Sequence, residues 1–333
     1  MRRICWITFS TLEKRGDVFY SPFASTRYRV LIPARWLEAR GYSQSIVSAE
    51  QPEAAMSAAM NADVIIFSKS NQPSNEEILA AAQRAGAKVI VDLCDYKFDM
   101  KQKGDHDRAM LARADALVAN TQEMAAAISD ETGREAAVIG DPYEGPKGVA
   151  EWKWRPGRRI EALWFGHPVN LDTLEVLLSQ LAVRKAEVAL SVRICTRPRV
   201  GLEEECRIFN RQVGNRVKVY IVPWSVEQVW KELRETDMVL LPSRVGMEKK
   251  DVKSPNRLVE SVWAGRFALA SALPAYQPFA EWIPLGDDFC ANLDWVMSHQ
   301  SEIVPRIHAA QDFVAAHYSP EVIGKQWEAV IEA

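Results

Sequence analysis

The chain has 333 residues, and its 48% hydrophobic and 26% charged residues are typical of a folded globular protein, which excludes a collagen-like or disordered chain. This length is enough for about two domains. Because 41 Lys and Arg stand against 44 Asp and Glu, the net charge of -3 excludes a chain-wide basic surface for nucleic acid.

The sequence predicts a cytoplasmic protein. No apolar run approaches the roughly 20 residues of a membrane-spanning helix, and the first residues lack the pattern of a signal peptide. The five cysteines are scattered, with no pair at the spacing of a metal or redox site. We expect them to be buried thiols in a reducing compartment.

Short apolar runs alternate with amphipathic stretches through the first 140 residues. Strands are expected at Arg3–Phe9, Ser45–Ser48, Asp63–Ser68, Lys88–Leu93, Ala116–Ala119 and Ala136–Ile139. Helices are expected at Tyr28–Arg40, Glu53–Met60, Ser74–Ala85, Asp105–Ala114 and Thr121–Glu131. Strands that alternate with helices indicate βαβ units on a parallel sheet.

The alternation stops at Asp141–Arg159, where six Pro and Gly residues and no apolar periodicity are typical of an interdomain linker. It resumes with strands expected at Ile160–Phe165, Val188–Cys195, Val217–Val222, Met238–Leu241 and Phe267–Ala270. We therefore predict an N-terminal domain at 1–140, a linker at 141–158 and a second domain at 159–318. A last helix at 319–333, with an apolar face, should cross back to the N-terminal domain.

The segment Arg244–Arg257 is rich in Lys and Arg and leads into a helix. Ser254 and Pro255 predict an N-cap and a first helical position. A helix N-terminus with added cations is suited to binding phosphate. The alternative is a basic loop that faces solvent.

The residues Lys253-Ser254-Pro255-Asn256-Arg257-Leu258-Val259-Glu260, continued to Ser271, resemble the donor-binding signature of GT-B fold glycosyltransferases, especially the retaining family 4 group. The preceding run Thr236–Ser243 is similar to that family's strand ending in Pro-Ser. The resemblance implies an α/β fold with two Rossmann-like, doubly wound domains that face each other across a cleft. Two departures leave retaining and inverting transfer both open: Val252 stands where the family has its first glutamate, and Asp92 and Asp95 replace an N-domain histidine.

The implied activity is metal-independent transfer of a sugar from a nucleotide-sugar, with UDP, GDP or another nucleotide, to a glycan, lipid-linked or small-molecule acceptor. No cofactor is expected beyond this co-substrate. Two alternatives remain: a non-hydrolysing sugar-nucleotide epimerase, and a non-catalytic nucleotide-sugar-binding protein.

The resemblance assigns the donor side of the site. Lys253 and Arg257 would meet the diphosphate, with Asn256 on the same helix face, and Glu260 would accept hydrogen bonds from the ribose. For Glu260 the alternative is a local ion pair with Arg257. Two further donor-side residues come from strand-end loops: Trp224, which either stacks on the base or packs in its loop, and Arg197.

Catalytic candidates are Asp92, Asp95 and His167. One of the carboxylates would orient or deprotonate the acceptor hydroxyl, or the pair would cap a helix. His167 would contact phosphate or cap its own turn.

Acceptor-side candidates are Arg27, Arg29 and Lys69. Arg27 and Arg29, with Arg35 and Arg40, suggest either a solvated helix face or a basic face for peripheral contact with the inner membrane surface.

Overall fold

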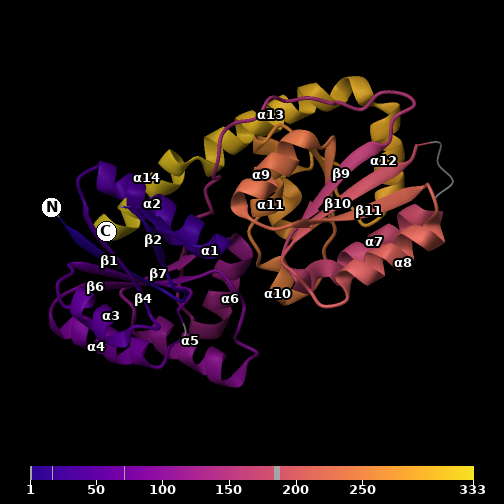
Figure 1. The fold of residues 1–333 in the computed structure, drawn as a ribbon. Helices are drawn as coiled ribbons and strands as arrows, with labels where there is room; N and C mark the ends of the chain where they lie inside the picture. The colour runs from indigo at the N-terminus through magenta and orange to yellow at the C-terminus, as the bar shows by residue number, and fades with distance from the viewer. Residues whose placement is uncertain (1, 17, 71, 184–187) are drawn as a thin grey trace. The chain divides into compact units, whose positions relative to one another are not determined.

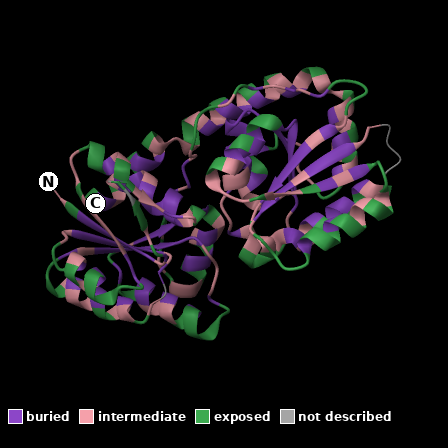
Figure 2. Cartoon of the chain, viewed as in Figure 1, coloured by how far each residue is buried: buried purple, intermediate pink, exposed green. Residues whose placement is uncertain are grey.

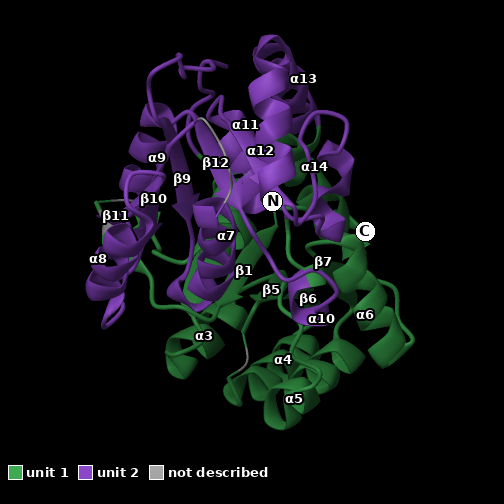
Figure 3. Ribbon diagram, turned by 90° about the vertical axis from the view of Figure 1, so that its right-hand side faces the viewer, with its two compact units in different colours: residues 1–144, 251–254, 317–333 green, residues 145–250, 255–316 purple. Residues whose placement is uncertain are grey.

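Two parallel β-sheets, one in each of two compact units, form the framework of the protein (Figure 1). The computed structural model describes residues 2–16, 18–70, 72–183 and 188–333. The strands of both sheets are largely buried (Figure 2). Residues 1–144, 251–254 and 317–333 form unit 1, and residues 145–250 and 255–316 form unit 2 (Figure 3).

The sheet of unit 1 has the strand order β4-β1-β5-β6-β7-β8. Its strands are β1 (Arg3–Thr8), β4 (Ser43–Ser48), β5 (Val64–Ser68), β6 (Lys88–Leu93), β7 (Ala116–Ala119) and β8 (Ala137–Val138). A short antiparallel pair, β2 (Glu13–Arg15) and β3 (Val18–Tyr20), follows β1. The helices are α1 (Ala24–Thr26), the π-helix η1 (Arg27–Leu31), α2 (Ile32–Ala39), α3 (Pro52–Ala59), α4 (Ser74–Arg84), α5 (Lys101–Arg113), α6 (Gln122–Thr132) and α14 (Pro320–Glu332).

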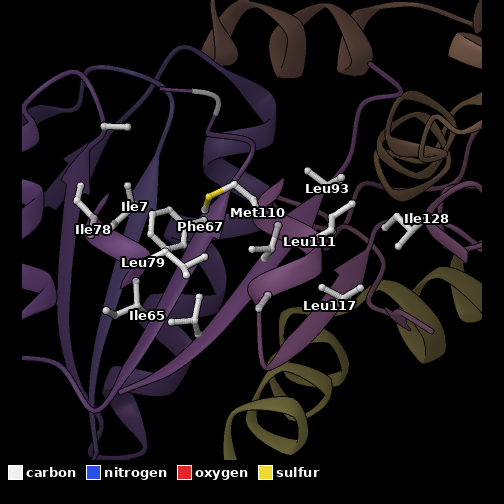
Figure 4. Close-up of a cluster of buried hydrophobic side chains, with 14 of the residues drawn as sticks. Ile7, Ile65, Phe67, Ile78, Leu79, Leu93, Met110, Leu111, Leu117 and Ile128 are labelled. Carbon is white, nitrogen blue, oxygen red and sulfur yellow. The ribbon is translucent and has the colours of Figure 1, made fainter. Parts of the chain in front are cut away.

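Alternating side chains of this sheet fill two apolar clusters, one on each face. Ile65 and Phe67 belong to the cluster covered by α3, α4, α5 and α6 (Figure 4). Val64 and Ile66 belong to the other cluster, which is covered by η1, α2 and α14. The last helix of the chain therefore completes the core of unit 1.

The sheet of unit 2 has the order β11-β10-β9-β12-β13. Its strands are β9 (Ile160–Phe165), β10 (Leu190–Thr196), β11 (Val217–Pro223), β12 (Met238–Leu241) and β13 (Phe267–Ala270). Its helices are η2 (Pro168–Asn170), α7 (Leu171–Val183), α8 (Leu202–Val213), α9 (Val226–Glu235), α10 (Glu248–Asp251), α11 (Asn256–Trp263), η3 (Pro274–Phe279), α12 (Phe289–Ser298) and α13 (Gln300–Tyr318). α10 and α13 end just inside unit 1.

The two sheets confirm the predicted α/β, doubly wound class. In unit 1 the strand order reverses between β1 and β5, and in unit 2 it reverses between β9 and β12. Ligands of such sheets bind outside the carboxyl ends of the strands at the point of reversal. The loops that follow β1, β5, β9 and β12 are therefore the first places to look for a site.

One helix differs from its sequence prediction. In place of a single helix over Tyr28–Arg40, the chain forms α1, the π-helix η1 and then α2. Pro33 stands in the first turn of α2 and has no N–H to donate, so a regular α-helical hydrogen bond is missing there. The π-helix next to it accommodates the missing bond, and it carries the buried residues Arg27 and Arg29.

The contact between α14 and α2 gives a test of this packing. Gly324 of α14 lies against Trp36 of α2, and a Cβ atom at Gly324 would overlap the indole ring. We expect Gly324→Ala to lower the free energy of unfolding by about 1–3 kcal/mol, the usual cost of overpacking. Thermal unfolding of the purified chain measures this loss.

Gly140→Ala is the matched control, because a Cβ there would meet Ile323 and Tyr318 at an ordinary distance of 3.7 Å. Its melting temperature should stay close to that of the parent chain. If Gly324→Ala has the same melting temperature as Gly140→Ala, the two helices move apart without cost and the contact does not constrain the fold.

Candidate functional site

The loops at the carboxyl edge of the unit 2 sheet are joined by hydrogen bonds. The Thr196 hydroxyl, at the end of β10, donates to the carbonyl of Gly166 at 2.8 Å. The N–H of Trp224, after β11, donates to the carbonyl of Thr196 at 3.0 Å. The ends of the three neighbouring strands β9, β10 and β11 are thus joined, and β9 is one of the two strands between which the strand order reverses.

Arg257 brings a cation to this surface from the first turn of α11. A Cβ atom on Gly166 would lie 3.5 Å from the Arg257 Nη1 atom, so the guanidinium reaches the loop after β9. Nη1 is buried and has no hydrogen-bond partner among the described residues. A buried N–H without a partner is costly, and an anionic oxygen is the partner that a guanidinium binds best.

Asn256 and Glu260 stand with Arg257 on α11. At 3.6 residues per turn, Glu260 lies about one turn beyond both. Glu260 is only 6% exposed, whereas Asn256 is half-buried. Helix geometry therefore puts the three residues on one face of α11, and Arg257 is the one whose side chain reaches Gly166.

Arg197 and Trp224 pair at the opposite side of the same edge. The Arg197 guanidinium lies 5.0 Å from the centroid of the Trp224 ring, a cation–π contact. Trp224 is half-exposed rather than buried. The ring is therefore partly accessible, with Arg197 against it.

His167 caps its own turn, which was one of its two predicted roles. Its Nδ1 accepts a hydrogen bond from the N–H of Val169 at 3.2 Å. Burial, and then the nearby Arg197 charge, lower the His167 pKa below its ordinary value. The ring is therefore neutral at pH 7, and with Nδ1 accepting, Nε2 carries the hydrogen and can donate it.

In unit 1, Asp92 and Arg29 form a buried ion pair. Both side chains have no exposed surface, and Arg29 Nη2 lies 2.5 Å from Asp92 Oδ1. Arg29 Nη1 also binds Asp141 at 3.0 Å, and the Ser68 hydroxyl donates to Asp92 at 2.8 Å. In this structure Asp92 cannot reach an acceptor hydroxyl and Arg29 cannot reach an acceptor, so the geometry favours structural roles for both.

Asp95 lies between two lysines at the carboxyl edge of the unit 1 sheet. It binds Lys253, and its second oxygen lies 2.6 Å from Lys69 Nζ. Burial alone would raise the Asp95 pKa, but the charges of Lys253 and Lys69 outweigh it and hold the pKa at about 2. Lys69 has a φ of 53°, a backbone region that a lysine rarely adopts. Because its pKa is about 2, the Asp95 carboxyl group is ionised at pH 7 and is a weak base.

Arg27 is also engaged in an ion pair. Its guanidinium lies 2.7 Å from Glu144, which also accepts a hydrogen bond from the Tyr28 hydroxyl at 3.0 Å. Arg40 stacks on Trp36 and binds Glu328.

These arginines bear on the predicted basic face for a membrane surface. Because Arg27 and Arg29 are both buried, the four arginines do not form one exposed basic face. In the described ranges, no helix is long and apolar enough to cross a bilayer.

The start of α11 departs from its prediction. The helix begins at Asn256 and the position before it is Pro255, with no side-chain cap. The Ser254 hydroxyl instead donates to Asp141 at 2.6 Å. Asp141 belongs to no motif that predicts this contact, and its position after β8 is the available signal in the sequence. Among the described side chains, no three or more His, Cys, Asp or Glu are grouped to hold a metal ion.

The His167 environment gives a direct test of the unit 2 surface. Arg197→Gln should raise the His167 pKa toward its ordinary value, because one of the two causes of its lowering is removed. Titration of the His167 ring by NMR measures the change. Arg199→Gln is the matched control, since Arg199 pairs with Glu205 instead. An unchanged His167 pKa in Arg197→Gln would mean that the two side chains do not share this surface.

Solved glycosyltransferase structures share this architecture. The Anabaena protein HepE in complex with UDP is 14% identical, with a TM-score of 0.71 over 99% of each chain. An alpha-glucosyltransferase in complex with UDP is 11% identical, with a TM-score of 0.68 over 100% of each chain. A glycosyltransferase from Rickettsia africae is 11% identical, with a TM-score of 0.68 over 99% of this chain and 98% of its own.

Neither a protein-family model nor a curated protein sequence matches the chain. At identities this low, a structural match shows the fold alone. The sequence resemblance predicted that fold from its donor-binding segment. The chain has the two-domain α/β architecture of these enzymes, the GT-B fold.

Proposed function

We propose that the protein is a glycosyltransferase that uses a UDP-sugar as its donor. The observation that carries the proposal is the buried, partnerless Nη1 of Arg257 beside Gly166, at the point where the strand order of unit 2 reverses. A phosphate oxygen supplies the partner that this N–H needs. UDP is favoured among nucleotides because HepE and the alpha-glucosyltransferase were solved in complex with it.

In the proposed reaction, the bond between the sugar's anomeric carbon and the diphosphate oxygen breaks, and a bond to the acceptor oxygen forms. Negative charge accumulates on the departing UDP. Arg257 and the Nε2–H of His167 would donate hydrogen bonds to that charge, and Lys253, four residues before Arg257, would add a second cation. With these cations at the diphosphate, we propose transfer that is independent of metal.

The rest of the nucleotide would lie along the same edge of unit 2. Glu260 would accept hydrogen bonds from the ribose hydroxyls, with Asn256 beside it. Trp224, held by Arg197, would stack on the uracil ring. These assignments follow the sequence resemblance, and the contact between Arg197 and Trp224 after neighbouring strands supports the part that concerns the base.

On the acceptor side, Lys69 and Asp95 are the candidates with exposed atoms. A carboxylate with a pKa of about 2 would orient the acceptor hydroxyl rather than remove its proton. The acceptor is proposed to be a glycan, lipid-linked or small-molecule alcohol. Two other outcomes of an assay would replace this function: conversion of UDP-GlcNAc to its manno epimer, or donor binding with neither transfer nor hydrolysis.

The phosphate assignment predicts the effect of removing each cation. Arg257→Ala and Lys253→Ala should each weaken UDP binding by about 1–3 kcal/mol, the range for hydrogen bonds to charged groups. Calorimetric titration with UDP measures both losses. Arg207→Ala, on the exposed face of α8 in an ion pair with Glu204, is the control and should bind UDP normally. UDP affinity that is unchanged in both variants would place the diphosphate elsewhere.

The ribose assignment is tested with a change on each side of the contact. Glu260→Gln keeps the shape but loses the charge, and should weaken UDP binding about tenfold or more. The parent chain should also bind 2′-deoxy-UDP less tightly than UDP, and Glu260→Gln should shrink that difference. Glu203→Gln, on α8, is the control. If Glu260→Gln discriminates between the two nucleotides as well as the parent chain does, the carboxylate does not hold the ribose.

A further inference from the structure

Four residues from the middle of the unit 2 sequence belong to unit 1. The chain leaves unit 2 after Lys250, and returns to it at Pro255, immediately before α11 (Figure 3). We call the residues between, Asp251–Ser254, the docked segment. Its last three residues each have a separate attachment to unit 1.

Val252 is attached by its side chain and by its carbonyl. The side chain is 2% exposed and lies in the apolar cluster beneath the unit 1 sheet. The carbonyl accepts hydrogen bonds from the Thr121 hydroxyl at 3.0 Å and the Asn120 amide at 3.4 Å. Lys253 follows with its ion pair to Asp95. These contacts hold the docked segment against unit 1 through a buried side chain, a backbone carbonyl and an ion pair.

Ser254 is attached to the buried ion-pair network of unit 1. Its hydroxyl donates to Asp141 Oδ2 at 2.6 Å, and the other oxygen of Asp141 binds Arg29 Nη1 at 3.0 Å. Arg29 is fully buried and also holds Asp92. Because a buried charge without its partner is costly, this network has little freedom to rearrange.

Ser254 is two residues from Asn256 and three from Arg257. We propose that Asp141 is a positioning residue: through Ser254 it fixes the first turn of α11, and with it the direction of the Arg257 guanidinium. This inference rests on the proposed function for its effect on UDP. Asp141 touches no part of the nucleotide in this proposal, and acts only through the docked segment.

The test removes the Ser254 hydroxyl and compares the effect with that of removing the hydroxyl of a matched serine in the same network. Ser68 also donates to a carboxylate that holds Arg29, but its hydroxyl is bonded to Asp92 and not to Asp141, which binds the docked segment. Ser254→Ala should weaken UDP binding by roughly two- to thirtyfold, the range for residues that act through a chain of contacts. Ser68→Ala should bind UDP as the parent chain does, and Ser254→Thr, which keeps the hydroxyl, should restore affinity.

Hydrogen exchange gives a second measure that needs no ligand. Peptides that cover residues 252–262 should exchange faster in Ser254→Ala than in the parent chain or Ser68→Ala, while peptides from β10 should not change. Unchanged exchange in Ser254→Ala, or equal effects of the two alanine variants, would overturn the proposal. If the parent chain binds no nucleotide, the proposed function fails and the exchange of residues 252–262 still decides the role of the Asp141 contact.

Discussion

The buried Arg29 guanidinium is the constraint on which much of unit 1 depends. A charge with no exposed surface must be paired, and Arg29 has Asp92 on one side and Asp141 on the other. Asp92 lies near the end of β6 and Asp141 follows β8, so the ion pairs tie the ends of two strands together. Arg29 lies in the π-helix with its side chain buried, and Asp141 in turn accepts a hydrogen bond from the Ser254 hydroxyl. One buried cation therefore connects the loop after β1 with the segment that leads into α11.

The hydrogen-bond and ion-pair partners of three arginines distinguish residues that look alike in the sequence. Arg27, Arg29 and Arg257 all lie in loops or helix starts near strand ends, and each was a candidate for substrate contact. In the structure Arg27 has Glu144 and Arg29 has two carboxylates, whereas the buried Nη1 of Arg257 has no partner among the described residues. Pairing with a carboxylate satisfies a cation internally. The partnerless N–H is the feature that points toward a ligand.

Local pattern was enough to predict most of the framework. Strands such as Asp63–Ser68 and Lys88–Leu93 were recognisable because β-branched runs of this length are typical of buried parallel strands. The donor-side helix was recognisable from signals at its two ends, Ser254 and Pro255 at the start and Gly265 after the last turn. Its first residue was misplaced because Ser254 uses its hydroxyl for Asp141, 113 residues away in the sequence. The Ser254 hydroxyl could either cap α11 or bind Asp141, and a short stretch of sequence around Ser254 does not include Asp141.

The roles of the two unit 1 carboxylates could not be predicted because they depend on burial and on distant partners. Asp92 and Asp95 are three residues apart, and both follow the apolar run of β6. Asp92 is drawn inward by Arg29, 63 residues before it, and Asp95 is held at the surface by Lys69 and Lys253. The two lysines around this one carboxylate keep the Asp95 pKa near 2. A group so strongly stabilised as an anion has little tendency to take up a proton. Chemistry that needs a strong base at this edge would therefore have to draw on a residue other than Asp95.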